Sequence, residues 1–239
     1  MAHHAILTAE DHRTLRIDTG HGARLGDAVM SCLVVPTEFR RVQADYPILF
    51  RLSAERDRFQ PLAMFGFEPG ENLFLDGDRW DARYRPLAMQ IQPFLIGQPA
   101  AGSGDRQIHV DLDSPRIATG DEGVRVFDEV GRATPYLEAI AGQLGELDAG
   151  WRMVDDFFAA LARHELLEPL TLEITLDNGS INRLVGYHAI NEERVQQLGP
   201  AALGELHAGG YLLPIFMALA SLSQIAELVA RKNAVVRRG

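Results

Sequence analysis

Residues 134–164, TPYLEAIAGQLGELDAGWRMVDDFFAALARH, carry the longest helical pattern in the chain. Their apolar side chains recur every three or four positions, which places them on one face of a helix. Pro135 suits the first helical position, because no hydrogen bond is lost there. The residues of this face are Leu137, Ile140, Leu144, Leu147, Trp151, Val154, Phe158 and Leu161. The pattern predicts one or two helices docked on the protein's own core, with a dimer seam as the alternative.

A β-hairpin is predicted directly after this helix, in residues 170–190, LTLEITLDNGSINRLVGYHAI. Two β-favouring runs, 170–176 and 181–190, flank Asp177, Asn178 and Gly179. Asn-Gly tolerates the positive φ angles of a type I′ turn, whose twist suits the two strands. A long helix followed by a hairpin favours an α+β fold.

The remaining expected elements lie on either side of these two. Strands are expected at residues 28–35, 48–52, 62–67, 72–75, 108–112 and 124–127, and short helices at residues 38–44, 191–198 and 200–207. An apolar helical face runs from Ile215 to Val229. The prediction is a mixed, largely antiparallel, meandering sheet, with several packed helices in the C-terminal half. We expect one domain, residues 1–239, with a subdomain joint in the loop of small residues at 98–105.

The composition limits the classes of partner. The chain has 239 residues, 46% of them hydrophobic, and a formal net charge of -10. Nucleic acids and anionic membranes need a basic surface, so we expect neither as a partner. Positive charge clusters only in the tail, at Arg231, Lys232, Arg237 and Arg238, where it suits the C-terminal end of a helix.

The N-terminus and the apolar stretches predict a cytoplasmic protein without a membrane span. Residues 1–14 are polar and resemble no secretory signal. The longest apolar stretch, residues 211–222, contains Pro214 and is shorter than the ~20 residues that a span requires. Cys32 is the only cysteine and lies in an apolar run, so we expect an inert thiol and no intrachain disulfide.

One spacing suggests metal chemistry. His109 and Asp111 are two residues apart in an expected strand, which points both side chains to the same side. This is the His-x-Asp spacing of a two-His-one-carboxylate iron site, which a distant histidine would complete. The alternative is a polar face of a sheet. The glycine-rich residues 20–26 lack the spacing of a dinucleotide-binding loop and are interpreted as a plain turn.

The segment from Glu71 to Phe94 is the strongest candidate for a binding surface. It concentrates aromatic, acidic and arginine side chains around one turn, and such residues often anchor ligands or partner proteins. The candidate residues are Glu71, Asn72, Arg79, Trp80, Asp81 and Tyr84. The alternative is a surface turn whose Trp80 folds back on the core while the charges pair locally.

Several blocks of the sequence resemble a known family. They include Gly70-Glu71-Asn72-Leu73-Phe74-Leu75-Asp76, Arg79-Trp80-Asp81-Ala82-Arg83-Tyr84, Val126-Phe127-Asp128-Glu129 and Leu166-Leu167-Glu168-Pro169. In this order, over nearly the whole chain, the blocks look like the SapC-like family of proteobacterial proteins. The resemblance implies an accessory or peptide-binding role, and it supplies no catalytic residues.

Together these observations favour a non-catalytic cytoplasmic protein that binds a peptide or protein and needs no cofactor. One alternative is a non-haem iron-dependent oxygenase that uses His109 and Asp111. Another is a structural protein associated with a surface layer.

Overall fold

The computed structural model describes residues 3–97 and 106–237. The chain forms two compact units. Unit 1 comprises residues 1–27, 75–80 and 87–149, and unit 2 comprises residues 28–74, 81–86 and 150–239. The subdomain joint expected at residues 98–105 lies outside the described residues.

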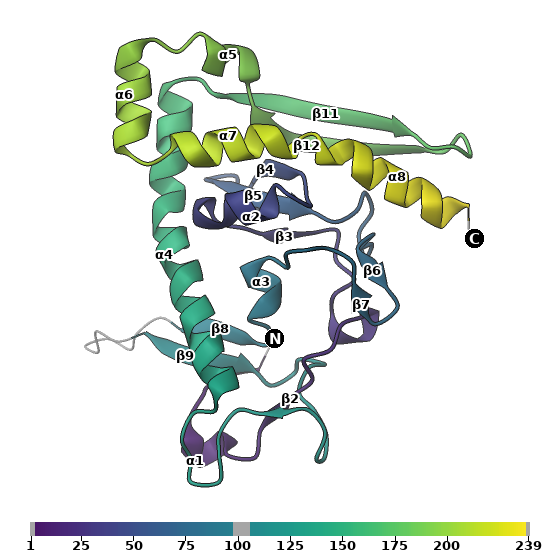
Figure 1. Cartoon of the computed structure of the whole chain (residues 1–239), viewed down its shortest axis with the longest axis vertical. Coiled ribbons are helices and arrows are strands. Elements are labelled where there is room, and N and C mark those ends of the chain that lie inside the picture. The colour runs from purple at the N-terminus through teal and green to yellow at the C-terminus, as the bar shows by residue number, and fades with distance from the viewer. Residues whose placement is uncertain (1–2, 98–105, 238–239) are drawn as a thin grey trace. The chain divides into compact units, whose positions relative to one another are not determined.

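Unit 1 consists of short strands, short helices and the first part of the long helix α4 (Figure 1). Its strands are β1 His4–Ile6, β2 Arg16–Ile17, β6 Leu75–Asp76, β7 Arg79–Trp80, β8 Phe94–Gly97, β9 Gln107–Asp111 and β10 Val124–Arg125. Its short helices are α1 Ala9–His12, the 3-10 turn η1 Ala23–Leu25 and α3 Leu87–Gln90. β9 lies between β1 and β8, and two further pairs are β10 with β2 and β6 with β7. Val110 and Phe94 face each other across β9 and β8 and are buried.

Unit 2 contains a five-stranded sheet in the order β11-β12-β4-β5-β3. Its strands are β3 Ser31–Leu33, β4 Ile48–Leu52, β5 Phe59–Met64, β11 Leu167–Thr175 and β12 Ile181–Ile190. The expected meander is wrong in one respect: β3 pairs with β5 rather than with β4. Instead β12 lies beside β4, with Tyr187 opposite Arg51. No local sequence pattern could predict this pairing, because β4 and β12 are far apart in the sequence.

The predicted β-hairpin is present, but its turn is not type I′. That turn requires a positive φ at both central residues. Gly179 has a φ of 82°, whereas Asn178 is not among the residues with positive φ. The Gly179 N–H donates to the carbonyl of Leu176, and the Leu176 N–H donates to the carbonyl of Ser180. Residues 176–179 therefore form a turn in which Gly179 alone has the left-handed backbone conformation.

Unit 2 also contains short helices and the second part of the long helix α4. They are η2 Pro36–Glu38, α2 Phe39–Val42, the second part of α4 Pro135–Arg163, α5 Glu192–Gln196, α6 Pro200–Ala208, α7 Leu212–Ser221 and α8 Gln224–Val236. The predicted helix at 134–164 is thus a single helix. Gly150 within it lies against Val35 and Thr37, where a Cβ would come within 2.4 Å of Val35 Cγ2. Phe50 and Phe158 meet nearby at 5.3 Å between ring centroids.

Helices α7 and α8 form one apolar helical stretch, Leu212–Val236. By length and composition alone it is long enough to cross a membrane. In unit 2, α7 contacts α2, β4 and β12 (Figure 1). The Ser221 hydroxyl, fully buried, accepts a hydrogen bond of 2.9 Å from the Ile48 N–H. The first part of this stretch, α7, is therefore packed on the sheet of unit 2. All the strand pairs described are antiparallel, and the predicted α+β class is confirmed.

Candidate functional site

The candidate binding residues are divided between the two units. Arg79 and Trp80 belong to unit 1, whereas Glu71, Asn72, Asp81 and Tyr84 belong to unit 2. Each group is built into the polar network of its own unit.

Arg79 and Trp80 are adjacent residues on the β6–β7 hairpin, but the first is exposed and the second is buried. Gly77 has a φ of 66°, which allows the tight reversal between the two strands. Arg79 Nη2 lies 3.4 Å from Asp76 Oδ2, and these side chains are 66% and 67% exposed. Trp80, by contrast, is only 9% exposed. The hairpin therefore presents charges to solvent and buries its aromatic side chain.

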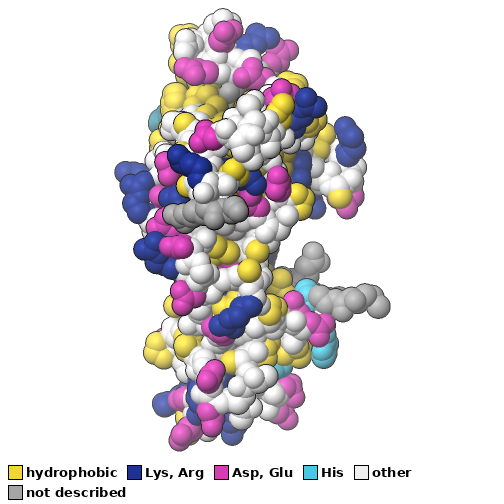
Figure 2. Space-filling view, turned by 90° about the vertical axis from the view of Figure 1, so that its right-hand side faces the viewer, with side chains coloured by type: hydrophobic (Ala, Val, Ile, Leu, Met, Phe, Trp, Pro, Cys, Tyr) yellow, Lys and Arg dark blue, Asp and Glu magenta, His cyan; other side chains and the backbone are white. Residues whose placement is uncertain are grey.

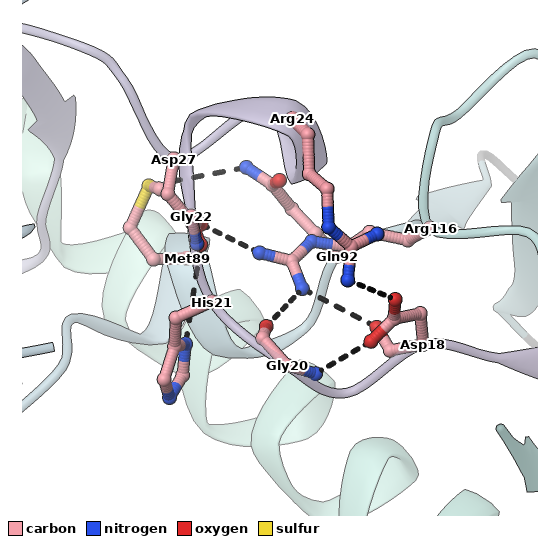
Figure 3. Close-up of polar contacts among 9 residues, drawn as sticks. All are labelled: Asp18, Gly20, His21, Gly22, Arg24, Asp27, Met89, Gln92 and Arg116. Carbon is pink, nitrogen blue, oxygen red and sulfur yellow. Dashed lines mark hydrogen bonds and ion pairs between the residues drawn. The ribbon is translucent and has the colours of Figure 1, made fainter. Parts of the chain in front are cut away.

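Trp80 packs edge-on against His21, with 6.2 Å between ring centroids. His21 belongs to the glycine-rich loop 20–26, and its Nδ1 lies 3.9 Å from Asp27 Oδ2. Figure 3 shows His21 beside Gly22, with the Asp27 carboxylate at the end of the loop. Trp80 thus rests on a loop whose conformation depends on a buried carboxylate.

Asp27 forms a buried ion pair with Arg116 (Figure 3). Arg116 Nη2 lies 2.5 Å from Asp27 Oδ1, and the exposed fractions of the two residues are 2% and 0%. Arg116 Nη1 also donates to the carbonyls of Gly20, at 2.9 Å, and Asp18, at 3.4 Å. The Gly22 N–H donates to the second carboxylate oxygen of Asp27 at 3.0 Å. The charges are thus neutralised and largely hydrogen-bonded, which burial of an ion pair requires.

This pair was missed by the sequence interpretation, which treated residues 20–26 as a plain turn. Asp27 and Arg116 are 89 positions apart, so no local spacing connects them. The glycines did carry a signal, because Gly22 and Gly26 have φ angles of 133° and 87°. Such backbone angles are favourable only for glycine. The loop wraps the Asp27 carboxylate and is held by Arg116.

A polar cavity of about 310 Å³ lies at the edge of the same loop. Asp18 and Arg24 line it and form a 3.0 Å ion pair. The Gly20 N–H bonded to Asp18 holds the pKa of that carboxyl below its usual range, and the Arg24 guanidinium contributes further. Asp18 is therefore ionised and paired at neutral pH.

In unit 2, Glu71 joins the loop after β5 to helix α8. Its Oε1 lies 2.6 Å from Lys232 Nζ, and its Oε2 accepts the Phe67 N–H at 2.8 Å. Lys232 Nζ also reaches Glu68 Oε2 at 3.3 Å, and Asn182 donates to the other oxygen of Glu68. The hydrogen bond from Asn182 and the Lys232 ammonium hold the pKa of Glu68 below its usual range. Besides the predicted interaction of the tail cations with a helix terminus, Lys232 thus forms ion pairs with Glu68 and Glu71.

Asn72 and Asp81 have similar positioning roles. The Asn72 side-chain oxygen accepts the Phe74 N–H at 3.0 Å, which fixes the turn before β6. Asp81 Oδ2 lies 3.0 Å from Arg231 Nη1. The Arg231 guanidinium also lies 4.4 Å from the centroid of the Phe74 ring, within the range of a cation–π contact.

Tyr84 is fixed through each of its polar groups. Its hydroxyl donates to Glu38 Oε2 at 2.7 Å, and its N–H donates to Asp45 Oδ2 at 3.1 Å. Its carbonyl accepts the Tyr46 hydroxyl at 2.5 Å. The Arg41 guanidinium lies 4.9 Å from the centroid of the Tyr84 ring. Tyr84 is half-buried, so part of this fixed side chain stays accessible to solvent.

His109 and Asp111 lie on β9, as the sequence predicted, and the buried His109 Nε2 has no hydrogen-bond partner among the described residues. The His109 ring lies over Gly97, where a Cβ would come within 2.1 Å of Nε2. Asp111 Oδ1 accepts the Asp113 N–H at 3.1 Å. Within residues 3–97 and 106–237, no group of three or more His, Cys, Asp or Glu side chains is arranged to hold a metal ion. The oxygenase alternative therefore rests on the sequence spacing alone.

Cys32 lies on β3. Burial of the thiol raises its pKa well above the usual range, and the Glu38 carboxylate adds to this effect. A thiol in this state is a poor nucleophile at neutral pH.

Fold and contacts together define an α+β protein whose two units each depend on a network of ion pairs. The model of the SapC family matches residues 7–228, so the chain belongs to the SapC family. Neither the curated proteins nor the solved structures compared with the chain gave a match.

Proposed function

We propose that this SapC-family chain is a non-catalytic binding or accessory protein of the bacterial cytoplasm. Its partner is a peptide or protein, recognised through residues of the segment 71–84. The candidate contact residues are Glu71, Asn72, Arg79, Trp80, Asp81 and Tyr84.

The observation that carries the proposal is the rigid support of an accessible segment. Tyr84 is half-buried yet hydrogen-bonded at its N–H, carbonyl and hydroxyl. Arg79 is 66% exposed, and it directly precedes Trp80, which is anchored by burial. Side chains that are already fixed lose little conformational entropy on binding, which favours affinity. Glu71, Asn72 and Asp81 contribute by holding the backbone of the segment.

Co-purification from the native cell tests this proposal. The variant Arg79→Glu reverses an exposed charge and leaves the buried Trp80 in place, so the fold should be retained. We expect the recovery of a specific partner to fall about tenfold, the equivalent of about 1.4 kcal/mol of binding free energy. The matched control is Arg183→Glu on β12, whose side chain is 64% exposed and outside the segment.

Tyr84→Ala and Trp80→Ala complete the series, with circular dichroism to establish that each variant is folded. Partner recovery that is unchanged in all the folded variants of the segment would overturn the proposal. A loss that is equal in Arg183→Glu would show that only the net charge matters.

A further inference from the structure

The surroundings of Tyr84 include two arginines that are exposed and held in place. Arg41 projects from α2 and stacks on the Tyr84 ring at 4.9 Å. Arg83 donates from Nε to Asp45 Oδ1 at 3.0 Å and from Nη2 to the Ala44 carbonyl at 2.5 Å. Despite these contacts, the Arg83 side chain remains 78% exposed.

The charges around Tyr84 are separated by depth. Glu38, which accepts the Tyr84 hydroxyl, is fully buried. The Asp45 side chain, which accepts from both Arg83 and the Tyr84 N–H, is only 9% exposed. Arg41 and Arg83 are exposed. The exposed charges of this cluster are therefore the two guanidinium groups, although the whole chain has a net charge of -10.

The guanidinium group of Arg83 retains hydrogen-bonding capacity. A guanidinium has five N–H donors, and the two contacts to Asp45 and Ala44 leave Nη1 available. Because Nε and Nη2 are already fixed, this outer edge is preorganised for a carboxylate, which guanidinium groups bind in a planar geometry. On the face of the molecule shown in Figure 2, Lys and Arg side chains lie among Asp and Glu side chains.

From this arrangement we propose that Arg41, Arg83 and Tyr84 form a docking surface for an acidic peptide segment of the partner. We call these three residues the Tyr84 surface. The inference rests on the proposed function and names the chemistry of the partner. A short acidic peptide fits better than a nucleic acid, because the net charge of -10 repels a long polyanion while two arginines suffice for a few carboxylates.

Fluorescence anisotropy with a labelled hexaglutamate peptide tests the inference on the full chain at about 50 mM salt, where surface charges are weakly screened. Arg41→Gln and Arg83→Gln should each weaken binding about three- to fivefold, and the double variant about tenfold or more. Arg183→Gln is the control, because it removes the same charge from an exposed side chain on β12. Circular dichroism and the urea midpoint monitor folding.

Three outcomes would overturn the inference. These are no binding of hexaglutamate, an equal loss in Arg183→Gln, and tighter binding of a labelled oligothymidine than of hexaglutamate. The same variants in co-purification separate this inference from the proposed function. If Arg79→Glu loses the partner while the Arg41→Gln/Arg83→Gln double variant keeps it, the Tyr84 surface is rejected and the binding function stands. If both keep it, and the folded Tyr84→Ala and Trp80→Ala variants keep it too, the proposed function fails as well.

Discussion

Lys232 and Glu71 form an ion pair with 2.6 Å between Nζ and Oε1, and this pair docks helix α8 on the loop that follows β5. Lys232 is the only lysine in the chain, and its side chain is 10% exposed. Glu71 is also the first of the candidate binding residues. Part of the specific composition of this segment therefore serves to hold the C-terminal helix in place.

Lys232→Met should destabilise unit 2. The substitution keeps the length of the side chain but leaves the Glu71 carboxylate, 16% exposed, without its cation. Removal of one partner from a fully buried pair costs about 3–5 kcal/mol, and the partial exposure here reduces the expected loss to about 1–3 kcal/mol. Urea unfolding measures the difference. Arg237→Met is the control, since Arg237 is 66% exposed and 3.9 Å from its partner, Asp177. Equal stability of both variants would contradict the role of Lys232.

Arg116→Met should unfold or loosen unit 1. It leaves the fully buried Asp27 carboxylate unpaired and removes the donor to the Gly20 carbonyl. We expect a loss of about 3–5 kcal/mol in the free energy of unfolding. In a Trp151→Phe background, Trp80 is the only tryptophan, and it reports on unit 1 through its contact with His21. An unchanged Trp80 unfolding transition would show that the pair is dispensable. Arg24→Met is the control, because its ion pair with Asp18 is exposed.

Only part of the fold could be predicted from the sequence. Residues 134–164 and the hairpin at 170–190 were predictable, because periodicity and turn chemistry are local properties. β1 and β2 were not, since strands of two or three residues carry no measurable alternation. The site divides in the same way. The unusual composition around Trp80 and Tyr84 was visible, but their partners His21 and Glu38 come from distant segments. The same holds for Arg116, the partner of Asp27. Contacts of this kind depend on the tertiary fold and have no spacing to detect.

His188 should make unit 2 sensitive to mild acid. Burial lowers the pKa of His188 from its usual value of 6.5, and its ring lies 4.8 Å from that of Phe59. The unfolded chain therefore binds a proton at a higher pH than the folded chain does. Stability from this residue is fully present above about pH 6.5 and is lost as the pH falls from there through the folded pKa.

His188→Phe should remove this component of the pH dependence, measured as the free energy of unfolding between about pH 7.5 and pH 5. The variant keeps an aromatic ring against Phe59 and has no titrating group. His207→Gln on α6 is the control, because His207 is exposed. A slope that persists in His188→Phe, or that disappears in His207→Gln, would assign the effect to another residue.

Three glycines of helix α4 should respond in opposite directions to the same substitution. Alanine is favoured over glycine in a helix by up to about 1 kcal/mol. At Gly142 and Gly145 a Cβ would meet no atom within 4 Å, so Gly142→Ala and Gly145→Ala should raise the free energy of unfolding by up to about 1 kcal/mol. At Gly150 a Cβ would lie 2.4 Å from Val35 Cγ2 and 2.7 Å from Thr37 Oγ1, so Gly150→Ala should instead destabilise by about 1–3 kcal/mol. Thermal and urea unfolding of the three variants provide the comparison. A stabilising Gly150→Ala would mean that α4 does not approach Val35 as closely as the structure has it.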